Sequence, residues 1–371
     1  MRNTITMKQI AKLAGVHRST VDKVIHNRKG VSDSVRRNVQ RIIDSVGYKP
    51  NVIGKALKQQ DKKLRIAVIL VCVYSTSAVL EGIKIAYNEF SRFGMDIEYY
   101  FISYGDIDEQ VRAIDMLSDK GVDGVVILSF NSEKIINSVN RMVDKGIPVV
   151  TVNTDLMPSN RMCYVGQNHS NAGRTAARLA KEMLHGKGRM AIVCGSHQYI
   201  SATKERYTEF QKHIKEISTD IEIVEVVNTV ESDQRMFEVV FDLLKRVDID
   251  YIYATAGGIR GAGKAIKMLN KADKVKMICH DIFPEVLELI REGIVSCTIS
   301  QDNVEQGYRS VKILFEYLFY GEKPKKDYMH TAIDIRMVEN MPDDESEIPP
   351  PILDPAGLRQ WSGRLEMTGT G

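Results

Sequence analysis

The apolar positions of the first 50 residues repeat at helical spacing. Two stripes predict two short amphipathic helices: Ile10, Leu13 and Ala14, and then Val21, Val24 and Ile25. Gly15 lies between them and supplies the permissive backbone that a sharp helix–helix turn needs. A third helix is expected to begin after Ser32, a good N-cap, and to end at Gly47, because Pro50 cannot continue it.

From Leu64 the pattern changes to continuous apolar runs separated by amphipathic helical stretches. Such runs are typical of parallel strands that helices cover on both faces. The predicted strands are 65–71, 97–102, 124–128, 148–152, 190–194, 221–227, 251–254, 275–279 and 295–300. Their number exceeds one comfortable sheet, so the sequence predicts an α/β body of two doubly wound parallel-sheet subdomains with a cleft between them.

These patterns divide the chain into segments. We expect an all-α headpiece at 1–50, a short helix and polar linker at 51–63, an α/β body at 64–342 and a tail at 343–371. The tail begins with four acids in five residues, passes through three consecutive prolines and ends in Thr-Gly-Thr-Gly. This composition predicts disorder.

Charge is distributed unevenly along the chain. Residues 1–63 hold 15 Lys/Arg against 4 Asp/Glu, a net charge of +11, whereas the rest holds 36 against 44, a net charge of −8. A basic head on an acidic body suggests that the head meets a polyanion and the body does not. A solvated basic surface without a partner would give the same count.

The five cysteines are scattered and include no CxxC pair, so neither a metal site nor a redox motif has support, and we expect no cofactor. Reduced cysteines fit a cytoplasmic protein. No apolar run approaches the roughly 18 residues of a membrane span, and the polar, basic start does not resemble a signal peptide. We therefore expect no membrane partner.

The second predicted helix carries a polar face. Helical spacing places Arg18, Ser19, Asp22 and Lys23 together, opposite the apolar stripe. A helix in the DNA major groove needs such a face, because Arg or Lys reads guanine and hydroxyls contact bases or phosphates. The other interpretation is an ordinary solvated face. Gly15 and the basic head favour a helix-turn-helix.

From Thr6 to Leu57 the chain resembles the headpiece of the lactose-repressor (LacI) family of transcription regulators. The residues that carry the resemblance are Ile10-Ala11, Ala14-Gly15-Val16, Ser19-Thr20-Val21, Val31-Ser32, Gly47-Tyr48, Pro50-Asn51 and Ala56-Leu57. The resemblance implies a sequence-specific regulator, most simply a repressor, that binds a near-palindromic DNA operator as a homodimer.

The resemblance also implies roles for individual residues. Base-reading positions fall on Arg18, Ser19 and Lys23, and positions near phosphates on Thr6, His17 and Ser32. The hinge helix falls on 51–58, with Asn51, Lys55 and Leu57 at the minor groove. Leu57 matches the apolar wedge that kinks the duplex at a base step.

Asp22 departs from the family pattern, which usually has serine at this position. A carboxylate there would repel phosphate. It could instead orient Arg18 as an i,i+4 pair, which we favour, or accept a hydrogen bond from cytosine N4.

The body resembles the periplasmic sugar-binding-protein fold (type I) that this family uses as its effector sensor. The markers are Gly121-Val-Asp-Gly-Val-Val-Ile, Gly146-Ile-Pro-Val-Val, Gln167-Asn168 with Gly173, and Gln301-Asp302. The resemblance places one subdomain at about 64–166 and 302–329 and the other at about 167–301 and 330–342. It implies allosteric control of a carbohydrate-utilisation operon by a small sugar or sugar derivative.

In such folds ligands bind beyond the carboxyl ends of the strands. The residues at those ends are Tyr74, Ser75, Thr76, Asn153, Thr154, Lys204, Asp281 and Gln301. A sugar needs planar bidentate groups for neighbouring hydroxyls and an aromatic ring under its apolar face. Asp281, Asn153 and Gln301 are such groups, Tyr74 is the aromatic candidate, and Lys204 resembles the family's ligand-binding arginine.

Several of these residues have structural alternatives. Asp281 could cap a helix ahead of Pro284, and Gln301 could cap a helix near Asn303. Ala256 stands where ribose-type binders often have asparagine, and their aromatic pair is missing near Ser75, which leaves a phosphorylated or acidic ligand open. A catalytic pair of His280 and Asp281 is disfavoured, because the sequence marks no nucleophile nearby.

The rival hypothesis is a nucleotide-dependent enzyme with a DNA-binding head. The glycine-rich run 257–263 suggests it, but the GxGxxG pattern fails and no phosphate-loop Lys-Ser/Thr follows. We therefore predict that the chain is not an enzyme.

Overall fold

The structure, a computed structural model, describes residues 5–25, 30–46, 63–195, 200–230, 232–255 and 257–363, the last three without their side chains. The positions assigned to the hinge helix, Asn51, Lys55 and Leu57, lie outside the described residues, as does Ala256.

The headpiece has a hydrophobic core of its own. Helices α1 (Met7–Ala14), α2 (Arg18–Ile25) and α3 (Asp33–Val46) surround Ile10, Val21 and Val39, which are fully buried. Gly15 ends α1 in the left-handed conformation at φ 65°, which glycine adopts without steric cost. The turn between α1 and α2 predicted from Gly15 is confirmed.

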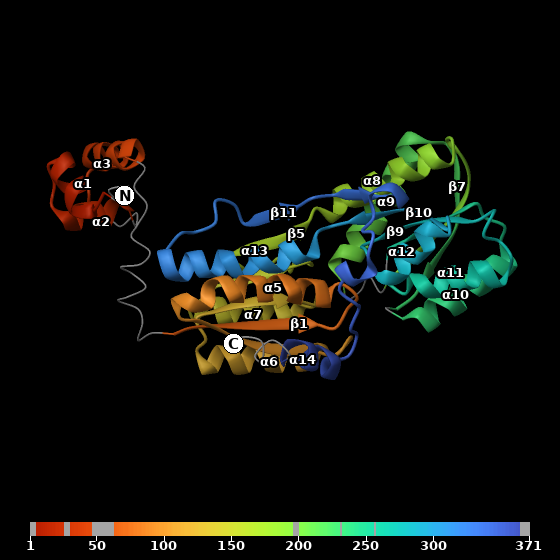
Figure 1. The fold of residues 1–371 in the computed structure, drawn as a ribbon, viewed down its shortest axis with the longest axis horizontal. Coiled ribbons are helices and arrows are strands. Elements are labelled where there is room, and N and C mark those ends of the chain that lie inside the picture. The colour runs from red at the N-terminus through yellow and green to blue at the C-terminus, as the bar shows by residue number, and fades with distance from the viewer. Residues whose placement is uncertain are drawn as a thin grey trace.

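The body contains two six-stranded sheets (Figure 1). The N-subdomain sheet has the order β11-β5-β4-β3-β1-β2 and parallel pairing throughout. Its strands are β1 (Leu64–Val71), β2 (Met95–Ile102), β3 (Gly124–Leu128), β4 (Val149–Val152), β5 (Cys163–Gln167) and β11 (Tyr328–Thr331). Its helices are α5 (Thr76–Phe90), α6 (Ile107–Lys120), α7 (Glu133–Asp144) and α13 (Asn303–Phe315), with short helical turns η1 (Ser91–Phe93) and η2 (Glu316–Tyr320).

The C-subdomain sheet has the order β12-β10-β9-β8-β6-β7, with only β12 antiparallel to its neighbour. Its strands are β6 (Lys187–Cys194), β7 (Asp220–Asn228), β8 (Tyr251–Ala254), β9 (Lys276–His280), β10 (Val295–Ser300) and β12 (Asp334–Arg336). Its helices are α8 (His169–Met183), α9 (Ser201–Ile217), α10 (Asp233–Arg246), α11 (Ile259–Met268) and α12 (Pro284–Arg291). The predicted fold of two parallel-sheet subdomains is confirmed.

Two glycines hold the N-subdomain helices close together. A Cβ atom at Gly307 of α13 would lie 1.9 Å from the carbonyl oxygen of Val79, and one at Gly82 of α5 would lie 1.8 Å from that of Val304. Any larger residue would force the two helices apart, so the close packing of α5 against α13 depends on these glycines.

Between Gln167 and Asp334 the chain passes between the subdomains at three neighbouring places, and buried amide side chains connect these three crossings. Gln167, at the end of β5, donates from Nε2 to the backbone oxygens of Ser300 and Ala332, at 3.0 and 3.1 Å. Gln306 donates from Nε2 to the backbone oxygen of Gln301, at 2.9 Å. These bonds make the crossings a hinge at the β5/β11 edge of the N-subdomain sheet.

The prediction of disorder in the tail is wrong for residues up to Gly363. The chain forms η3 (Val338–Asn340), η4 (Glu345–Glu347) and α14 (Pro355–Gly363), which contacts β2 and lies beside α6 (Figure 1). Leu358 is fully buried in the N-subdomain core, and Ile352 packs against that core. Apolar residues spaced among the acids and prolines therefore anchor this segment.

The five cysteines are free and buried. Within the described residues, no helix combines the length and apolarity required to cross a membrane.

Leu358 and Leu353 allow a matched test of the tail's packing. Leu358→Ala should lower the free energy of unfolding by about 2–4 kcal/mol, because it leaves a cavity in the core. Leu353→Ala should cost less than about 1 kcal/mol, because that side chain is 36% exposed. Chemical denaturation measures both, and equal small losses would show that α14 is not docked.

Candidate functional site

The polar face of α2 is exposed. Arg18, Ser19 and Lys23 point away from the headpiece core, whereas Asp22 is half-buried. Val21 and Val24 of the same helix are buried. The face expected to read DNA is thus free of headpiece packing, although whether it does so stays a prediction.

The residues expected near phosphates have local roles in the headpiece. Thr6 caps α1, since its side chain accepts from the backbone of Gln9 while the side chain of Gln9 accepts from the backbone of Thr6. His17 Nδ1 lies 2.8 Å from the Ser19 hydroxyl, and the Ser32 hydroxyl lies 3.3 Å from that of Ser34. These contacts orient the side chains at the start of α2 and α3.

A cavity of about 50 Å³ lies between the two subdomains. The N-subdomain lines it with Val73, Tyr74, Ser75, Asn153 and Thr154, and the C-subdomain and hinge line it with Ile200, Ala202, Thr203, Arg206, Thr255, Gly257, His280, Asp281, Phe283 and Gln301. Drug-sized ligands occupy pockets of several hundred Å³. The cleft is therefore closed, and a sugar would need it to open.

Asp281 lies at the centre of the cavity wall, just after β9. It is 8% exposed and has φ 66°, a strained conformation for a residue with a side chain. Its carboxylate accepts hydrogen bonds from Gln301 Nε2, at 2.9 and 3.0 Å, and from Asn303 Nδ2, at 3.0 Å. Burial raises the pKa of Asp281, while the charge of Arg206 and these amides oppose the rise.

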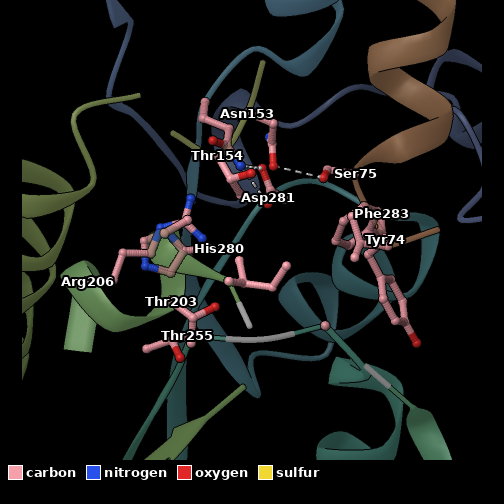
Figure 2. A pocket seen from close by; sticks show the side chains of 15 residues that line it. Tyr74, Ser75, Asn153, Thr154, Thr203, Arg206, Thr255, His280, Asp281 and Phe283 are labelled. Atoms are coloured by element: carbon pink, nitrogen blue, oxygen red, sulfur yellow. Dashed lines mark hydrogen bonds between the residues drawn. The ribbon is translucent and has the colours of Figure 1, made fainter. Parts of the chain in front are cut away.

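Asn153 occupies the corresponding place after β4, also with positive φ, at 66°. Its Nδ2 donates to Asn303 Oδ1 and to Gln306 Oε1, at 2.9 and 3.1 Å, and its Oδ1 accepts from the Ser75 hydroxyl at 3.3 Å (Figure 2). Asn303 therefore joins Asn153 of the N-subdomain to Asp281 of the C-subdomain. The cavity wall and the hinge share one amide network.

Arg206 is the charged residue of the cavity wall that the sequence interpretation missed. It is 5% exposed, lines the cavity, and its Nε and Nη2 atoms have no hydrogen-bond partner among the described residues. Gly173 of α8 lets that helix approach, because a Cβ atom there would lie 2.3 Å from the backbone oxygen of Arg206. A buried guanidinium with free donors is poised for an acceptor from outside the chain.

Lys204 and Thr76 do not line the cavity. Lys204 is exposed on another face of α9 and borders a separate surface hollow. Thr76 is fully buried and donates to the backbone oxygen of Val71 at 2.6 Å, so it shapes the turn after β1. Helical spacing could have identified Arg206, because it lies on the buried stripe of α9 with Ala202, Phe210 and Ile214.

His280 and two threonines flank Arg206 in Figure 2. His280 Nε2 lies 2.8 Å from the Tyr253 hydroxyl. Burial, with a further contribution from the charge of Arg206, holds the pKa of His280 well below its ordinary value. The imidazole is therefore neutral at pH 7, and with the hydroxyls of Thr203 and Thr255 it adds uncharged polar groups to the wall.

Aromatic rings form the other side of the cavity (Figure 2). Tyr74 and Phe283 pack edge to face, with ring centroids 5.2 Å apart. The Tyr74 hydroxyl donates to Asp233 Oδ1 across the cleft at 3.2 Å. Tyr74 comes from the N-subdomain yet packs in the C-subdomain core, so it helps to hold the cleft closed.

The cavity combines one carboxylate, one guanidinium, neutral polar groups and aromatic rings. Carboxylate and guanidinium can each hold two neighbouring hydroxyl groups, and the rings offer an apolar surface. The opposite charges of Asp281 and Arg206 balance each other. This arrangement suits an uncharged polyhydroxylated ligand better than an anion, which would meet Asp281.

The glycine-rich run after β8 serves helix packing. A Cβ atom at Gly261 would lie 1.9 Å from the backbone oxygen of Asp233 in α10, and one at Gly263 would lie 2.4 Å from Leu289 of α12. Gly258 begins α11 with φ 84°. These contacts account for the glycines without a bound phosphate.

Two families match the sequence. The family described as "Bacterial regulatory proteins, lacI family" matches residues 6–51, and the "Periplasmic binding protein domain" family matches residues 54–323. Together the two matches extend through the headpiece and most of the body.

The similar curated proteins are transcription regulators. The HTH-type transcriptional regulator TreR of Salmonella typhimurium is 30% identical over 35% of this chain and 40% of its own length. The HTH-type transcriptional regulator MalR of Clostridium butyricum is 24% identical over 90% of this chain and 98% of its own length. The chain thus spans less than half of TreR but nearly all of MalR.

Among solved structures, the body is similar to GanP, a glucose-galactose binding protein from Geobacillus stearothermophilus. The likeness has a TM-score of 0.69 at 26% identity and covers 76% of this chain and 100% of GanP.

Two buried arginines allow a test of whether Arg206 is unpartnered. Arg206→Met should stabilise the protein without ligand by about 1–3 kcal/mol, because it removes a buried charge whose donors are unsatisfied. Arg161 is the matched control, since its Nε and Nη2 bond the Asp155 carboxylate at 2.5 and 2.6 Å. Arg161→Met should destabilise by about 3–5 kcal/mol. Similar losses for both variants in denaturant titrations would refute the assignment.

Proposed function

This chain belongs to the periplasmic binding protein domain family, and its residues 6–51 match the bacterial lacI family of regulatory proteins. On that basis we propose that it is a DNA-binding transcription regulator, most simply a repressor. A small sugar or sugar derivative bound in the cleft would control it. The observation that carries the proposal is the closed cavity between the subdomains, where Asp281 and Arg206 face aromatic rings. A location in the cytoplasm, where the DNA is, follows from it.

The DNA-binding part of the proposal rests on α2. Arg18, Ser19 and Lys23 are exposed on one face and would read base edges in the major groove. Thr6, His17 and Ser32 would position the headpiece on phosphates, with Asp22 orienting Arg18. Asn51, Lys55 and Leu57 would bind the minor groove as a hinge helix. A near-palindromic operator needs two headpieces, so the proposal includes a homodimer.

The effector part of the proposal rests on charge balance in the cavity. Asp281 would accept from two hydroxyls of a sugar, Arg206 would donate to ring or hydroxyl oxygens, and Tyr74 or Phe283 would cover an apolar face. Ser75, Asn153, Thr154 and Gln301 complete the wall from both subdomains. An uncharged sugar is favoured over a sugar phosphate, because the phosphate would be repelled by Asp281.

The switch follows from the position of the cavity. A ligand that bridges the subdomains changes the relative populations of the open and closed conformations only if it binds these two conformations unequally. Contacts from both subdomains meet that condition. A change in the angle between the subdomains would then alter the spacing of the two headpieces across a dimer and so change operator affinity.

The alternative of a nucleotide-dependent enzyme has lost its main support. Gly261 and Gly263 allow neighbouring helices to pack closely, so these glycines are explained without a phosphate-binding loop. His280 faces the cavity as a neutral imidazole whose Nε2 is paired with the Tyr253 hydroxyl.

Arg18→Ala should weaken binding to the specific operator by about 1–3 kcal/mol and hardly change binding to random DNA, because base contacts are lost while phosphate contacts remain. Arg41→Ala is the control, since Arg41 is an exposed arginine on α3 rather than α2. Titrations on both DNAs separate the outcomes. Equal losses of binding free energy on the two DNAs would show that Arg18 contacts phosphate rather than bases.

The effector site is tested by thermal shift against a sugar library. A sugar at 100 times its Kd should stabilise the wild type by about 2.7 kcal/mol. Asp281→Ala and Arg206→Met should lose this response yet keep operator affinity without sugar close to wild type. Lys204→Ala should retain the response, because that side chain lies outside the cavity. A normal response from Asp281→Ala would move the site elsewhere.

A further inference from the structure

We propose that residues 341–358 form a strut that links the two subdomains away from the hinge and limits how far the cleft opens. The inference rests on the proposed effector cleft for its biological meaning, but the strut itself is defined by contacts that involve no ligand.

One end of the strut is fixed to the C-subdomain. Met341 packs against the C-subdomain core. Arg291, at the end of α12, donates from Nη2 to the backbone oxygen of Asp343 at 2.9 Å, and its Nη1 lies 3.7 Å from Glu345 Oε1. The η3 turn also contacts α12. Apolar packing, a backbone hydrogen bond and an ion pair therefore hold this end.

The other end is fixed to the N-subdomain. Leu358 of α14 is fully buried in the N-subdomain core, and Ile352 packs on the same core. The Asp354 carboxylate accepts from the backbone of Gly357 at 2.6 Å, which starts the helix. Detaching this end would expose the buried leucine to water, which is unfavourable, so this end does not detach freely.

The span between the two ends is stiff. It contains Pro349, Pro350 and Pro351 in succession, outside any helix or strand. Consecutive prolines adopt an extended polyproline conformation of about 3.1 Å per residue and act as semi-rigid spacers. The distance between the two anchored ends is thus fixed by a semi-rigid segment rather than by a flexible loop.

The strut is attached at the edge of the N-subdomain sheet that lies opposite the hinge, where it can oppose opening most effectively. The hinge crossings leave the N-subdomain sheet at the edge formed by β11 and β5, whereas α14 attaches at β2, the strand at the opposite edge. Motion about the hinge displaces the far edge most. Opening the cleft would therefore require the strut to bend at its prolines or to release one end.

The strut acts in the same direction as the contacts that keep the cleft closed. The cavity measures about 50 Å³ while Tyr74 remains in contact with Phe283 and Asp233. We infer that the strut favours this closed conformation, and that softening it raises the population of open molecules.

The test measures the distance between the subdomains in the full-length protein. Spin labels are placed through Asn137→Cys on α7 and Met268→Cys on α11, which are both exposed positions. The native thiols are buried, and burial raises the pKa of Cys72, Cys194, Cys279 and Cys297 to about 12 and that of Cys163 to about 11, so they do not compete for the label. Labelled protein is diluted with unlabelled protein, so that distances within one chain dominate the signal.

Replacing Pro349, Pro350 and Pro351 together by glycine softens the span while leaving both anchors intact. Double electron–electron resonance should give one narrow distance distribution for the wild type and for the control Leu353→Ala. The triple-glycine variant should lose the narrow population and shift to longer distances. Arg291→Ala, which releases the C-subdomain end, should shift in the same direction.

A narrow, unchanged distribution in the triple-glycine variant would overturn the proposal and reduce the tail to a surface attachment. The measurement requires neither sugar nor DNA. Failure of every sugar to shift the melting temperature would therefore count against the proposed function and leave the result on the strut standing.

Discussion

The buried amide network at the subdomain crossings is the constraint on which the rest of the body depends. Gln306, fully buried on α13, bonds both Asn153 and the backbone of Gln301, and Gln301 in turn holds the Asp281 carboxylate. Buried polar groups are costly unless each is satisfied, so such a network permits few arrangements. The same bonds that fix the hinge also aim the polar groups of the cavity. A change in the hydrogen bonds of the cavity therefore directly alters those of the hinge, because the same residues make both.

Arg206 differs from this network in having free donors. Asp281 is largely satisfied by protein amides, whereas the guanidinium keeps Nε and Nη2 unpaired in a buried place. An unsatisfied buried donor costs about 1–3 kcal/mol. A chain selected only for stability would replace it with an apolar residue. In the proposed function, the effector would supply the acceptor that Arg206 lacks.

The sequence predicted those parts of the fold that can be identified from the spacing of apolar residues and from turn-forming glycine. Apolar runs identified the long buried strands, and Gly15 identified the turn in the headpiece. Strands β5, β11 and β12 were missed. In β11 and β12, which lie at sheet edges, the exposed Tyr328 and the half-buried Ile335 break the apolar pattern. Strand β5 is buried, but its five residues end in Gly166 and Gln167, which interrupt the apolar run. Lys204 was chosen for its resemblance to the family's ligand-binding arginine, whereas the buried face of α9, which holds Arg206, is found from spacing around the helix. The prediction for the tail relied on average composition, which hides apolar residues such as Ile348, Ile352 and Leu358 that are buried or packed against the core.

The headpiece core is built entirely from residues 5–46, with Ile10, Val21 and Val39 at its centre and contributions from all its helices. None of the apolar residues of this cluster comes from the described part of the body. Each unit can therefore accept mutations without repacking the other. Choice of DNA half-site and choice of effector can diverge separately in evolution, and hybrid regulators could be made by joining this headpiece to the body of a relative.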